Sequence, residues 1–352
     1  MSTVASRTPL ARRSFLALGS GALLGLAGCA EGTAASVGSA PTGKLPSGAP
    51  PPGTELSISI HSTELQLKAS GKLAELPFRV THWPNFTAGP DVIQGFRARS
   101  IQLASNAGLP PIQAQAIGFD TKIVAVQLHE KPLYVFATAP GTDIRSAEDF
   151  RGKKLGFSQG QAQGAVLLRA VKEAGLSKDD VTLVPLTSNQ FLTALQTKQV
   201  DVAPLAEPVL TKYVDQFGKD GARRINTEVV DLLSVLWAPT SVLENGDKLA
   251  AVKSFIPFWA RGSVWAWEHK ERWNQVYYVK DQGVTAQDGR RIVKSLSVPV
   301  FPKSWDKAIA WEQETADLLT ENGFIPKTRV DSLFDRRFES IAARSVPAEY
   351  RK

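Results

Sequence analysis

Short runs of β-branched and aromatic residues alternate along the chain with stretches that have the apolar spacing of amphipathic helices. This alternation predicts an α/β protein with mainly parallel sheets. The clearest helix is expected over residues 161–174 (QAQGAVLLRAVKEA), because Val166, Leu167 and Ala170 fall on one stripe and Gly175 follows as a stop. Strands are expected at residues 56–61, 78–83, 101–104, 122–127, 133–138, 154–157, 181–185, 200–203 and 234–237.

The pattern changes at about residue 246, where strand-like runs become rare and long, charged, amphipathic stretches take over. Tryptophans at helical spacing are most often packing residues. We therefore expect helices that clasp the rest of the fold, rather than an aromatic platform for stacking a ligand. The tryptophans of this region are Trp259, Trp265, Trp267, Trp273, Trp305 and Trp311.

Residues 1–28 have the pattern of an export signal. Arg12 and Arg13 precede an apolar stretch at residues 15–27, which is too short for a bilayer span because a span needs roughly 20 residues. The two arginines resemble the twin-arginine signal. No later segment is both long enough and free of charge, so no transmembrane helix is expected.

The only cysteine, Cys29, follows directly. The sequence Leu26-Ala27-Gly28-Cys29 resembles a bacterial lipobox, in which the cysteine is lipidated and becomes the first residue of the mature protein. The alternative is that Cys29 is an ordinary small residue within the signal. We expect a lipid anchor on the extracytoplasmic face of the cell membrane, and a single cysteine excludes an intramolecular disulfide.

Residues 29–54 are nearly all Ala, Gly, Pro, Ser and Thr, which predicts a flexible tether behind the lipidated cysteine. The formal charge of the whole chain is +7, and three of its 41 basic residues lie in the signal. The remaining basic residues are scattered in pairs rather than gathered in a patch, so nucleic acid is not expected as a partner.

Catalytic motifs are missing from the sequence. It contains no Walker-type loop and no G-x-S-x-G turn, and a cysteine nucleophile is excluded because Cys29 belongs to the anchor. The four histidines lack metal-ligand spacing, although His61, His82 and Glu207 are kept as a less favoured group that could meet in space. A Ser-His-Asp triad stays open. We expect a protein that is not an enzyme and holds no metal or cofactor.

Three strand ends run into a helix start through small polar residues, at residues 83–90, 104–111 and 157–162. The first N–H groups of a helix lack intrahelical partners and carry a partial positive charge, so such a junction is a ready anion site. Gly160 would let a ligand approach the backbone closely. The alternative is a plain strand-to-helix connection with a Ser or Gln cap.

Five segments carry a family resemblance, namely residues 86–90, 110–116, 144–155, 200–208 and 323–335. They resemble the solute-binding proteins of ABC importers that take up aliphatic sulfonates, taurine and nitrate. The resemblance covers most of residues 55–340 and implies the periplasmic-binding-protein type II fold, with two α/β lobes, a ligand cleft between them and two crossings. Lobe 1 would comprise residues 55–139 and 236–340, lobe 2 residues 140–235, and residues 341–352 a C-terminal tail.

The resemblance implies a monomer that binds a small organic anion, feeds membrane permease subunits and stays at the membrane through its anchor. The sequence departs from the family where Gly160-Gln161-Ala162-Gln163 stands in place of a hydroxyl-rich Gly-Ser-Ser or Gly-Thr-Ser, which leaves the exact ligand open. The site residues implied are His61, Ser62, Thr87, Ala88, Ser105, Asn106, Ser158, Gly160, Gln161, Ala162 and Glu207.

Several alternatives remain at this stage. Glu207 either meets the amine of a zwitterion such as taurine or is a structural acid near the hinge. Nitrate and a heterocycle such as a thiamine precursor are the other ligands, and the heterocycle would need aromatic walls from Trp83, Phe86 or Trp237. An enzyme on the same fold, such as a desulfinase-like hydrolase, would need His61 or His82 in the cleft.

The sulfur content of the chain is very low. Met1 is the only methionine and Cys29 the only cysteine, so the mature chain would hold a single sulfur atom. A protein made during sulfur starvation would gain from this composition, which favours a scavenger of organosulfonates. The alternative is compositional drift, because Leu replaces Met at little packing cost.

Overall fold

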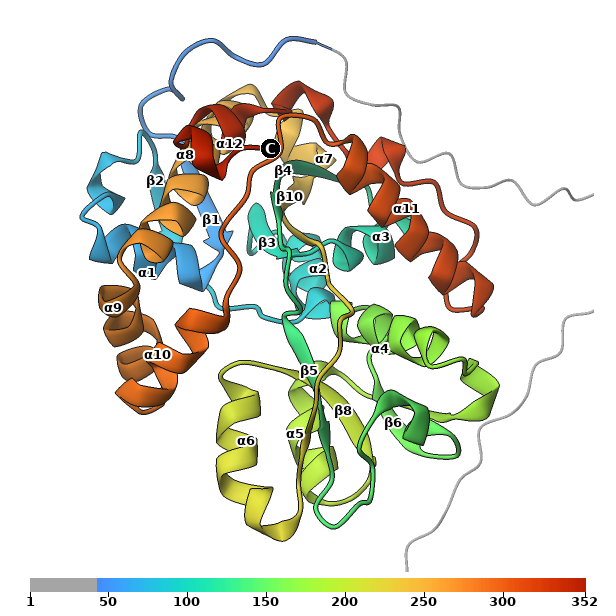
Figure 1. Cartoon of the computed structure of the whole chain (residues 1–352). Coiled ribbons are helices and arrows are strands. Elements are labelled where there is room, and N and C mark those ends of the chain that lie inside the picture. Colours follow the sequence, from blue (N-terminus) through green and yellow to red (C-terminus); the bar gives the residue numbers. More distant parts are fainter. Residues whose placement is uncertain (1–42) are drawn as a thin grey trace, which may run out of the picture. The chain divides into compact units, whose positions relative to one another are not determined.

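Two five-stranded sheets organise residues 43–352, the part of the chain that this computed structural model describes (Figure 1). The sheet of lobe 1 has the order β2-β1-β3-β10-β4, and the sheet of lobe 2 has the order β7-β6-β8-β5-β9. The strands of lobe 1 are β1 (Glu55–Ser59), β2 (Arg79–His82), β3 (Leu103–Ala107), β4 (Thr121–Leu128) and β10 (Leu233–Pro239). Those of lobe 2 are β5 (Tyr134–Thr138), β6 (Lys154–Phe157), β7 (Thr182–Pro185), β8 (Val202–Ala206) and β9 (Arg224–Ile225).

Both sheets are mixed, so the expectation of mainly parallel sheets was wrong. Strand β10 runs antiparallel to β3 and β4, and β5 runs antiparallel to β8 and β9. The remaining pairs are parallel. The reason lies in the crossings: β4 leaves lobe 1 and β10 returns to it, so the two strands run side by side in opposite directions, as do β5 and β9 in lobe 2.

Each of the nine expected strands is present within one to three residues of its expected bounds, and the helix at 161–174 is present as α4. Strand β9 was not predicted, because it has only two residues. The first strand ends before His61, which instead opens a helix.

Helices cover both sheets. Lobe 1 carries α1 (His61–Ala69), α2 (Gly89–Arg97), α3 (Leu109–Ala116), α7 (Thr240–Leu243), α8 (Gly246–Glu268), α9 (Lys270–Trp273), the π-helix η5 (Asn274–Asp281), α10 (Ala286–Ser295), α11 (Asp306–Glu321) and α12 (Ile341–Arg344). Lobe 2 carries α4 (Ala162–Glu173), α5 (Ser188–Gln196) and α6 (Val209–Phe217). Short 3₁₀ turns lie at η1 (Leu73–Glu75), η2 (Ala147–Phe150), η3 (Lys178–Asp180), η4 (Gly218–Asp220), η6 (Asp331–Leu333), η7 (Arg336–Phe338) and η8 (Ala348–Tyr350).

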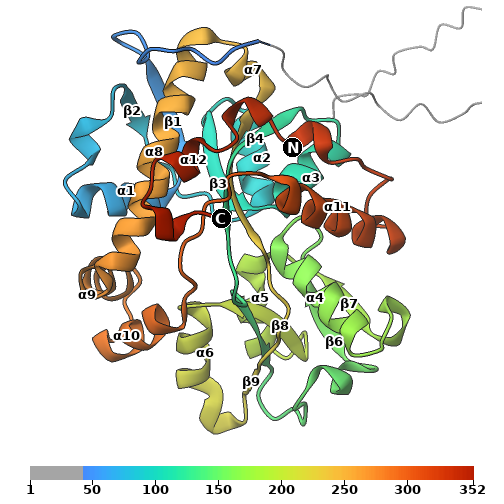
Figure 2. The ribbon, with the colours of Figure 1, turned by 45° about the horizontal axis from the view of Figure 1, so that its top comes forward.

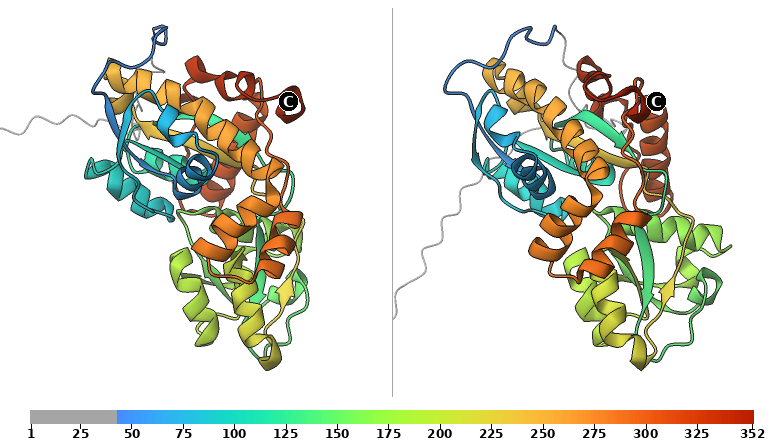
Figure 3. Two further views of the ribbon diagram at one scale, coloured as in Figure 1. Left: turned by 90° about the vertical axis from the view of Figure 1, so that its left-hand side faces the viewer. Right: turned by 60° about the vertical axis from the view of Figure 1, so that its left-hand side comes forward.

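The two crossings between the lobes lie at residues 129–133, between β4 and β5, and at residues 226–232, between β9 and β10. Figure 3 shows the lobes on either side of these crossings. The predicted boundaries at 139/140 and 235/236 are therefore revised, because β5 belongs to the sheet of lobe 2 and β10 starts within lobe 1.

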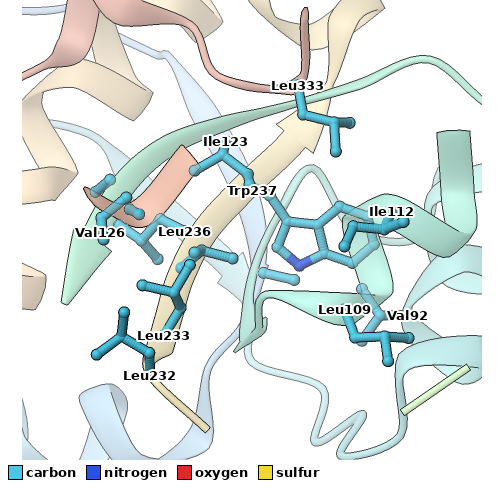
Figure 4. Packing of buried hydrophobic residues seen from close by; sticks show 14 of the residues in the cluster. Val92, Leu109, Ile112, Ile123, Val126, Leu232, Leu233, Leu236, Trp237 and Leu333 are labelled. Carbon is cyan, nitrogen blue, oxygen red and sulfur yellow. The ribbon is translucent and has the colours of Figure 1, made fainter. Parts of the chain in front are cut away.

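The core of lobe 1 is built around Trp237, which is fully buried on β10. Its ring meets Phe96 edge to face at a centroid distance of 4.8 Å. Figure 4 shows Ile112 and Leu109 of α3 beside the same ring. Trp237 is thus a packing residue, and it is not available as an aromatic wall for a ligand.

The C-terminal segment is part of lobe 1 and is not a tail. Ala343 and Tyr350 are buried, and the N–H of Phe301 donates to the carbonyl of Tyr350 over 2.8 Å. The last residues of the predicted tether also lie against lobe 1, since Leu45 packs on its core and Lys253 donates to the carbonyl of Pro46. The export signal, Cys29 and the first half of the tether lie outside the described residues.

Within residues 43–352, no helix combines the length and the apolar character that crossing a membrane requires. Of the tryptophans after residue 246, Trp259, Trp273 and Trp305 are buried and the other three are partly buried, which agrees with packing roles, although Trp259 also borders the space between the lobes.

Candidate functional site

A cavity of about 780 Å³ lies between the lobes, with walls from both of them. Lobe 1 contributes the ends of β1 and β3, the loop before α2 and parts of α8 and η5, and lobe 2 contributes the starts of α4, α5 and α6. The cavity therefore sits where strands end and helices begin, the place at which open α/β sheets bind ligands.

The start of α1 forms one wall of this cavity. Residues His61, Ser62 and Thr63 line it, and the first intrahelical bond of α1 runs from the N–H of Glu64 to the carbonyl of Ile60 over 3.1 Å. The three preceding N–H groups lie ahead of that bond, and no side chain in the described part of the chain caps the helix. Together with the two hydroxyls, they give lobe 1 a concentration of neutral hydrogen-bond donors that suits an anion.

The start of α5 faces the cavity from lobe 2 through Ser188 and Asn189. This helix begins after β7 with a capping box of Thr187 and Gln190, the same strand-to-helix junction that the sequence showed elsewhere. Helix α4 contributes only Gln163, from its second residue.

Six of the eleven predicted ligand residues line the cavity, namely His61, Ser62, Thr87, Ser105, Asn106 and Glu207. They come from four separate segments of the chain, so the fold brings together what the sequence left apart.

The other five predicted residues, Ala88, Ser158, Gly160, Gln161 and Ala162, are not part of the lining. Gln161 is buried and joins two helices, because its amide oxygen accepts from the N–H of Ser188 over 2.8 Å and its amide nitrogen donates to the hydroxyl of the same serine over 2.8 Å. Ser158 donates to that amide oxygen. These side chains position the start of α5.

Gly160 lies where the two lobes meet and is not part of the lining. A Cβ added to Gly89 at the start of α2 would lie 2.9 Å from the carbonyl oxygen of Gly160. Gly89 therefore lets the backbones of lobe 1 and lobe 2 meet closely, whereas a Cβ on Gly160 would make only ordinary contacts, and Ala88 is buried as the N-cap of α2.

The carboxylate of Glu207 lines the cavity but is already engaged with protein groups. It accepts from the hydroxyl of Thr211 over 2.6 Å and from Arg224 over 2.8 Å, and the Arg291 guanidinium lies 3.5 Å away. This arrangement favours the structural role that the sequence left open over a role as partner for a ligand amine.

The two candidate histidines are separated by the fold. His61 lies at the cavity, with Nε2 2.8 Å from Asp281 and Nδ1 3.6 Å from Glu64, whereas His82 lines a different hollow of lobe 1. Among residues 43–352, no three His, Cys, Asp or Glu side chains come together as a metal site would require. The alternative metal group of His61, His82 and Glu207 is therefore wrong.

Sequence reasoning missed most of the amide side chains of the site. Ser188 and Asn189 follow a strand and open a helix, so the junction rule would have found them. Gln127, Trp259 and Tyr277 lie within strands and helices, where no local pattern marks them. The missed amides are Gln66, Asn85, Gln127, Gln163, Asn189 and Gln282.

Among residues 43–352, no lysine or arginine lines the cavity. Its ionisable side chains are His61, Glu207 and Tyr277, and burial together with the charge of Asp281 raises the pKa of Tyr277. The tyrosine is therefore a neutral phenol at physiological pH. Hydroxyls, amides and helix N–H groups supply nearly all the polarity of the cavity.

Behind the cavity, buried acids lie at the junction of the lobes. Burial raises the pKa of Asp231, in the second crossing, to about 7, although Arg169 opposes the shift. Burial and the charge of Asp231 raise the pKa of Glu312 on α11 to about 8. Nearby, burial lowers the pKa of His129 to about 4, and its Nε2 lies 2.8 Å from the hydroxyl of Ser234.

Comparison with known proteins places this geometry in context. Residues 89–229 match the family model described as NMT1/THI5 like. An Escherichia coli K12 protein named as an aliphatic sulfonates-binding protein is 27% identical over 249 residues, which cover 70% of this chain and 76% of the relative. The resemblance to solute-binding proteins of the sulfonate group is thus confirmed.

Solved structures agree on the fold. The alkanesulfonate-binding protein SsuA from Xanthomonas axonopodis pv. citri, solved with MOPS, superposes with a TM-score of 0.70 at 19% identity, covering 82% of this chain and 99% of that one. The desulfurization enzyme DszB superposes with a TM-score of 0.54 at 16% identity, covering 83% and 98%. The chain has the periplasmic-binding-protein fold expected from the sequence, and an enzyme shares that fold.

Proposed function

We propose that this chain is the substrate-binding subunit of an ABC importer and that it captures a small organosulfonate between its lobes. The observation that carries the proposal is the interlobe cavity, with its uncapped α1 start on one side, the α5 start on the other and neutral donors around it. The names of the E. coli and X. axonopodis relatives support the same ligand class.

The charge of the cavity favours a sulfonate over a phosphate-like ion. A sulfonate is a monoanion at every physiological pH, whereas phosphate and phosphonate groups are partly dianionic near pH 7. A second negative charge would need a cationic side chain, because burying an unpaired charge is costly. Neutral donors and helix starts are sufficient for one delocalised charge.

The amide-rich walls suggest that the organic part of the ligand is itself polar. Gln127 and Gln163 each offer a donor and an acceptor, and buried polar groups need partners. Phe86, Trp259 and Tyr277 also line the cavity, so a compact ring would find aromatic contacts. The heterocycle alternative now rests on these three residues, because Trp83 and Trp237 are not part of the lining.

An enzymatic role is less well supported by the same site. His61 and Asp281 form a histidine–carboxylate pair at the cavity, as a hydrolase would require. A general base, however, needs its second ring nitrogen beside a nucleophile, and here that nitrogen faces Glu64. We propose binding without turnover. The release of sulfite from a supplied sulfonate or sulfinate would contradict this.

We further propose that the protein is exported, carries lipid on Cys29 and works at the extracytoplasmic face of the membrane. The support for export and for the anchor is the pattern of residues 1–29. The near absence of sulfur from the rest of the chain supports a role in sulfur scavenging. Palmitate labelling that is lost in Cys29→Ser would support the anchor. Expression that is indifferent to sulfate supply would count against sulfur scavenging.

The ligand is tested with full-length protein carrying Cys29→Ser, by thermal shift followed by calorimetry. Methanesulfonate, taurine and hexanesulfonate are compared with methylphosphonate, nitrate and a pyrimidine. A true ligand at a hundredfold excess over its dissociation constant stabilises by about 2.7 kcal/mol. Stabilisation by a sulfonate and none by methylphosphonate is expected. A shift by nitrate or the pyrimidine alone would overturn the sulfonate assignment.

A further inference from the structure

Besides the two crossings and the close approach of Gly89 to Gly160, residues 43–352 hold two further sets of contacts between the lobes. The first, the α4–α11 contact, joins α4 and the strand before it to α11 and the loop after it. The rings of Phe157 and Phe324 lie 4.5 Å apart, the Arg169 guanidinium lies 4.0 Å from the ring of Trp311, and Arg169 donates to the hydroxyl of Thr315 over 2.8 Å. Figure 2 shows α11 running beside α4.

The second set, here called the clasp, joins the start of α6 to η5 and α10. Arg291 of lobe 1 donates to the hydroxyl of Thr211, and its guanidinium lies 3.5 Å from the carboxylate of Glu207. Lys212 of lobe 2 donates to the backbone carbonyl of Gln282. In Figures 1 and 2, α10 lies over α6, away from α4 and α11.

The two sets differ in how easily water can replace them. Phe157 and Thr315 are each 3% exposed, and the α4–α11 contact combines aromatic surface with a stacked guanidinium. The side chain of Arg291 is 45% exposed, although its acceptor Thr211 is buried, and the clasp consists of hydrogen bonds and one ion pair. Half-exposed polar contacts contribute little net free energy because water offers equivalent partners.

The clasp also borders the ligand cavity without filling it. Glu207 and Gln282 line the cavity from opposite lobes, whereas Arg291 and Thr211 lie outside the lining. The neighbour of Gln282, Asp281, holds His61 at the start of α1. Separation of the clasp would therefore move two facing walls of the cavity apart.

We propose that Arg291, through the clasp, sets the balance between the open and closed states of the cleft, while the α4–α11 contact stays together in both states. The inference rests on the proposed function only in taking the cavity as the site that opens. Contacts made in one state alone shift the equilibrium toward that state. If a ligand binds only the closed state, its apparent affinity falls in proportion to the fraction of the protein that is closed.

The role of the clasp is tested by spin-label distances in the full-length chain. The Cys29→Ser background removes the only cysteine, so labels go only where cysteines are introduced. One pair, Gln216→Cys on α6 and Gln287→Cys on α10, spans the clasp. The other, Glu173→Cys on α4 and Glu314→Cys on α11, spans the α4–α11 contact. All four positions are exposed.

Arg291→Met should lengthen the distance distribution of the clasp pair and leave that of the α4–α11 pair unchanged. Arg290→Met is the matched control, because this neighbouring arginine lies 3.3 Å from Glu271 within lobe 1 and is 55% exposed. It should leave both distributions unchanged. Equal shifts in both pairs, no shift with Arg291→Met, or the same shift with Arg290→Met would overturn the proposal.

A second readout uses methanesulfonate as the probe. Arg291→Met should weaken its binding about fivefold, chiefly through faster dissociation, and Arg290→Met should not. The distance measurement needs no ligand, so it separates the two proposals. If the clasp distance lengthens as expected but the protein binds no sulfonate, the ligand proposal is refuted and the clasp proposal stands. If the protein binds a sulfonate but the distances do not change, the clasp proposal is refuted and the ligand proposal stands.

Discussion

Trp237 donates a hydrogen bond from its indole Nε1 to the side-chain oxygen of Asn106 over 2.9 Å. The tryptophan is wholly buried in the core of lobe 1, and the asparagine lines the interlobe cavity. Because the amide oxygen is occupied, the amide of Asn106 is left with its N–H donors for a ligand. A core residue thus fixes the hydrogen-bonding character of a site residue.

Trp237→Phe should weaken methanesulfonate binding about three- to tenfold, because Asn106 loses the donor that orients it. The unfolding free energy should also fall by about 1–3 kcal/mol, since the smaller ring leaves a cavity. Trp305→Phe is the control, because Trp305 is equally buried in lobe 1 but does not line the cavity. It should cost stability and leave affinity unchanged. Equal affinities in both variants would contradict the orienting role.

Ser62→Asp should reduce sulfonate affinity at least tenfold, because a carboxylate at the start of α1 repels an anion bound there. The same change should slightly stabilise the helix, since acids are favoured at helix starts. Ser70→Asp adds the same charge at the C-cap of the same helix, outside the cavity lining. Calorimetry should show little loss of affinity for it. A similar loss in both variants would place the anion elsewhere.

Gln161 and Gln163 lie two residues apart and should separate stability from binding. Gln161→Ala should lower the unfolding free energy by about 1 kcal/mol, because the partly buried N–H of Ser188 loses its acceptor and the buried Gln161 side chain is removed. Gln163→Ala should leave stability nearly unchanged and weaken the ligand, because its side chain lines the cavity. Chemical denaturation and calorimetry of both variants check this. Reversed effects would restore Gln161 as a ligand residue.

Stability should fall as the pH rises from about 5 to about 8. The folded state keeps a proton on Glu312, whose pKa is raised by burial to about 8, whereas the unfolded chain releases it near the ordinary value of 4.5. A group whose pKa is raised by folding contributes stability that is fully present below its unfolded-state pKa and is lost as the pH rises through its folded-state pKa. Asp231 acts in the same direction, with its pKa raised to about 7.

Glu312→Gln should flatten this decline, which amounts to about 1.4 kcal/mol per pH unit for one proton. Urea denaturation at pH 5, 6.5 and 8 measures it. Glu314→Gln, the same change at an exposed position of α11, should retain the wild-type slope. An unchanged slope in Glu312→Gln would mean that this carboxyl group is ionised in the folded protein.

Local patterns located the strands and several site residues, because both depend on neighbours in sequence. Ser62 and Asn106 each lie where a strand gives way to a helix, a junction that defines a binding edge wherever the sheet lies, and both line the cavity. Gln161 obeyed the same rule but does not line the cavity, because its side chain turns to the N–H of Ser188, a partner 27 residues away.

The sequence by itself determined the alternation of strands and helices, the resemblance to two-lobed binding proteins and the small polar residues at the strand ends. Each is a property of adjacent residues or of a short motif. Only the tertiary structure decided the antiparallel returns, the amide lining and the engagement of Glu207 by Arg224 and Arg291. Those depend on which distant segments pack together, since an ion pair or a cavity wall forms wherever folding brings its members within contact distance.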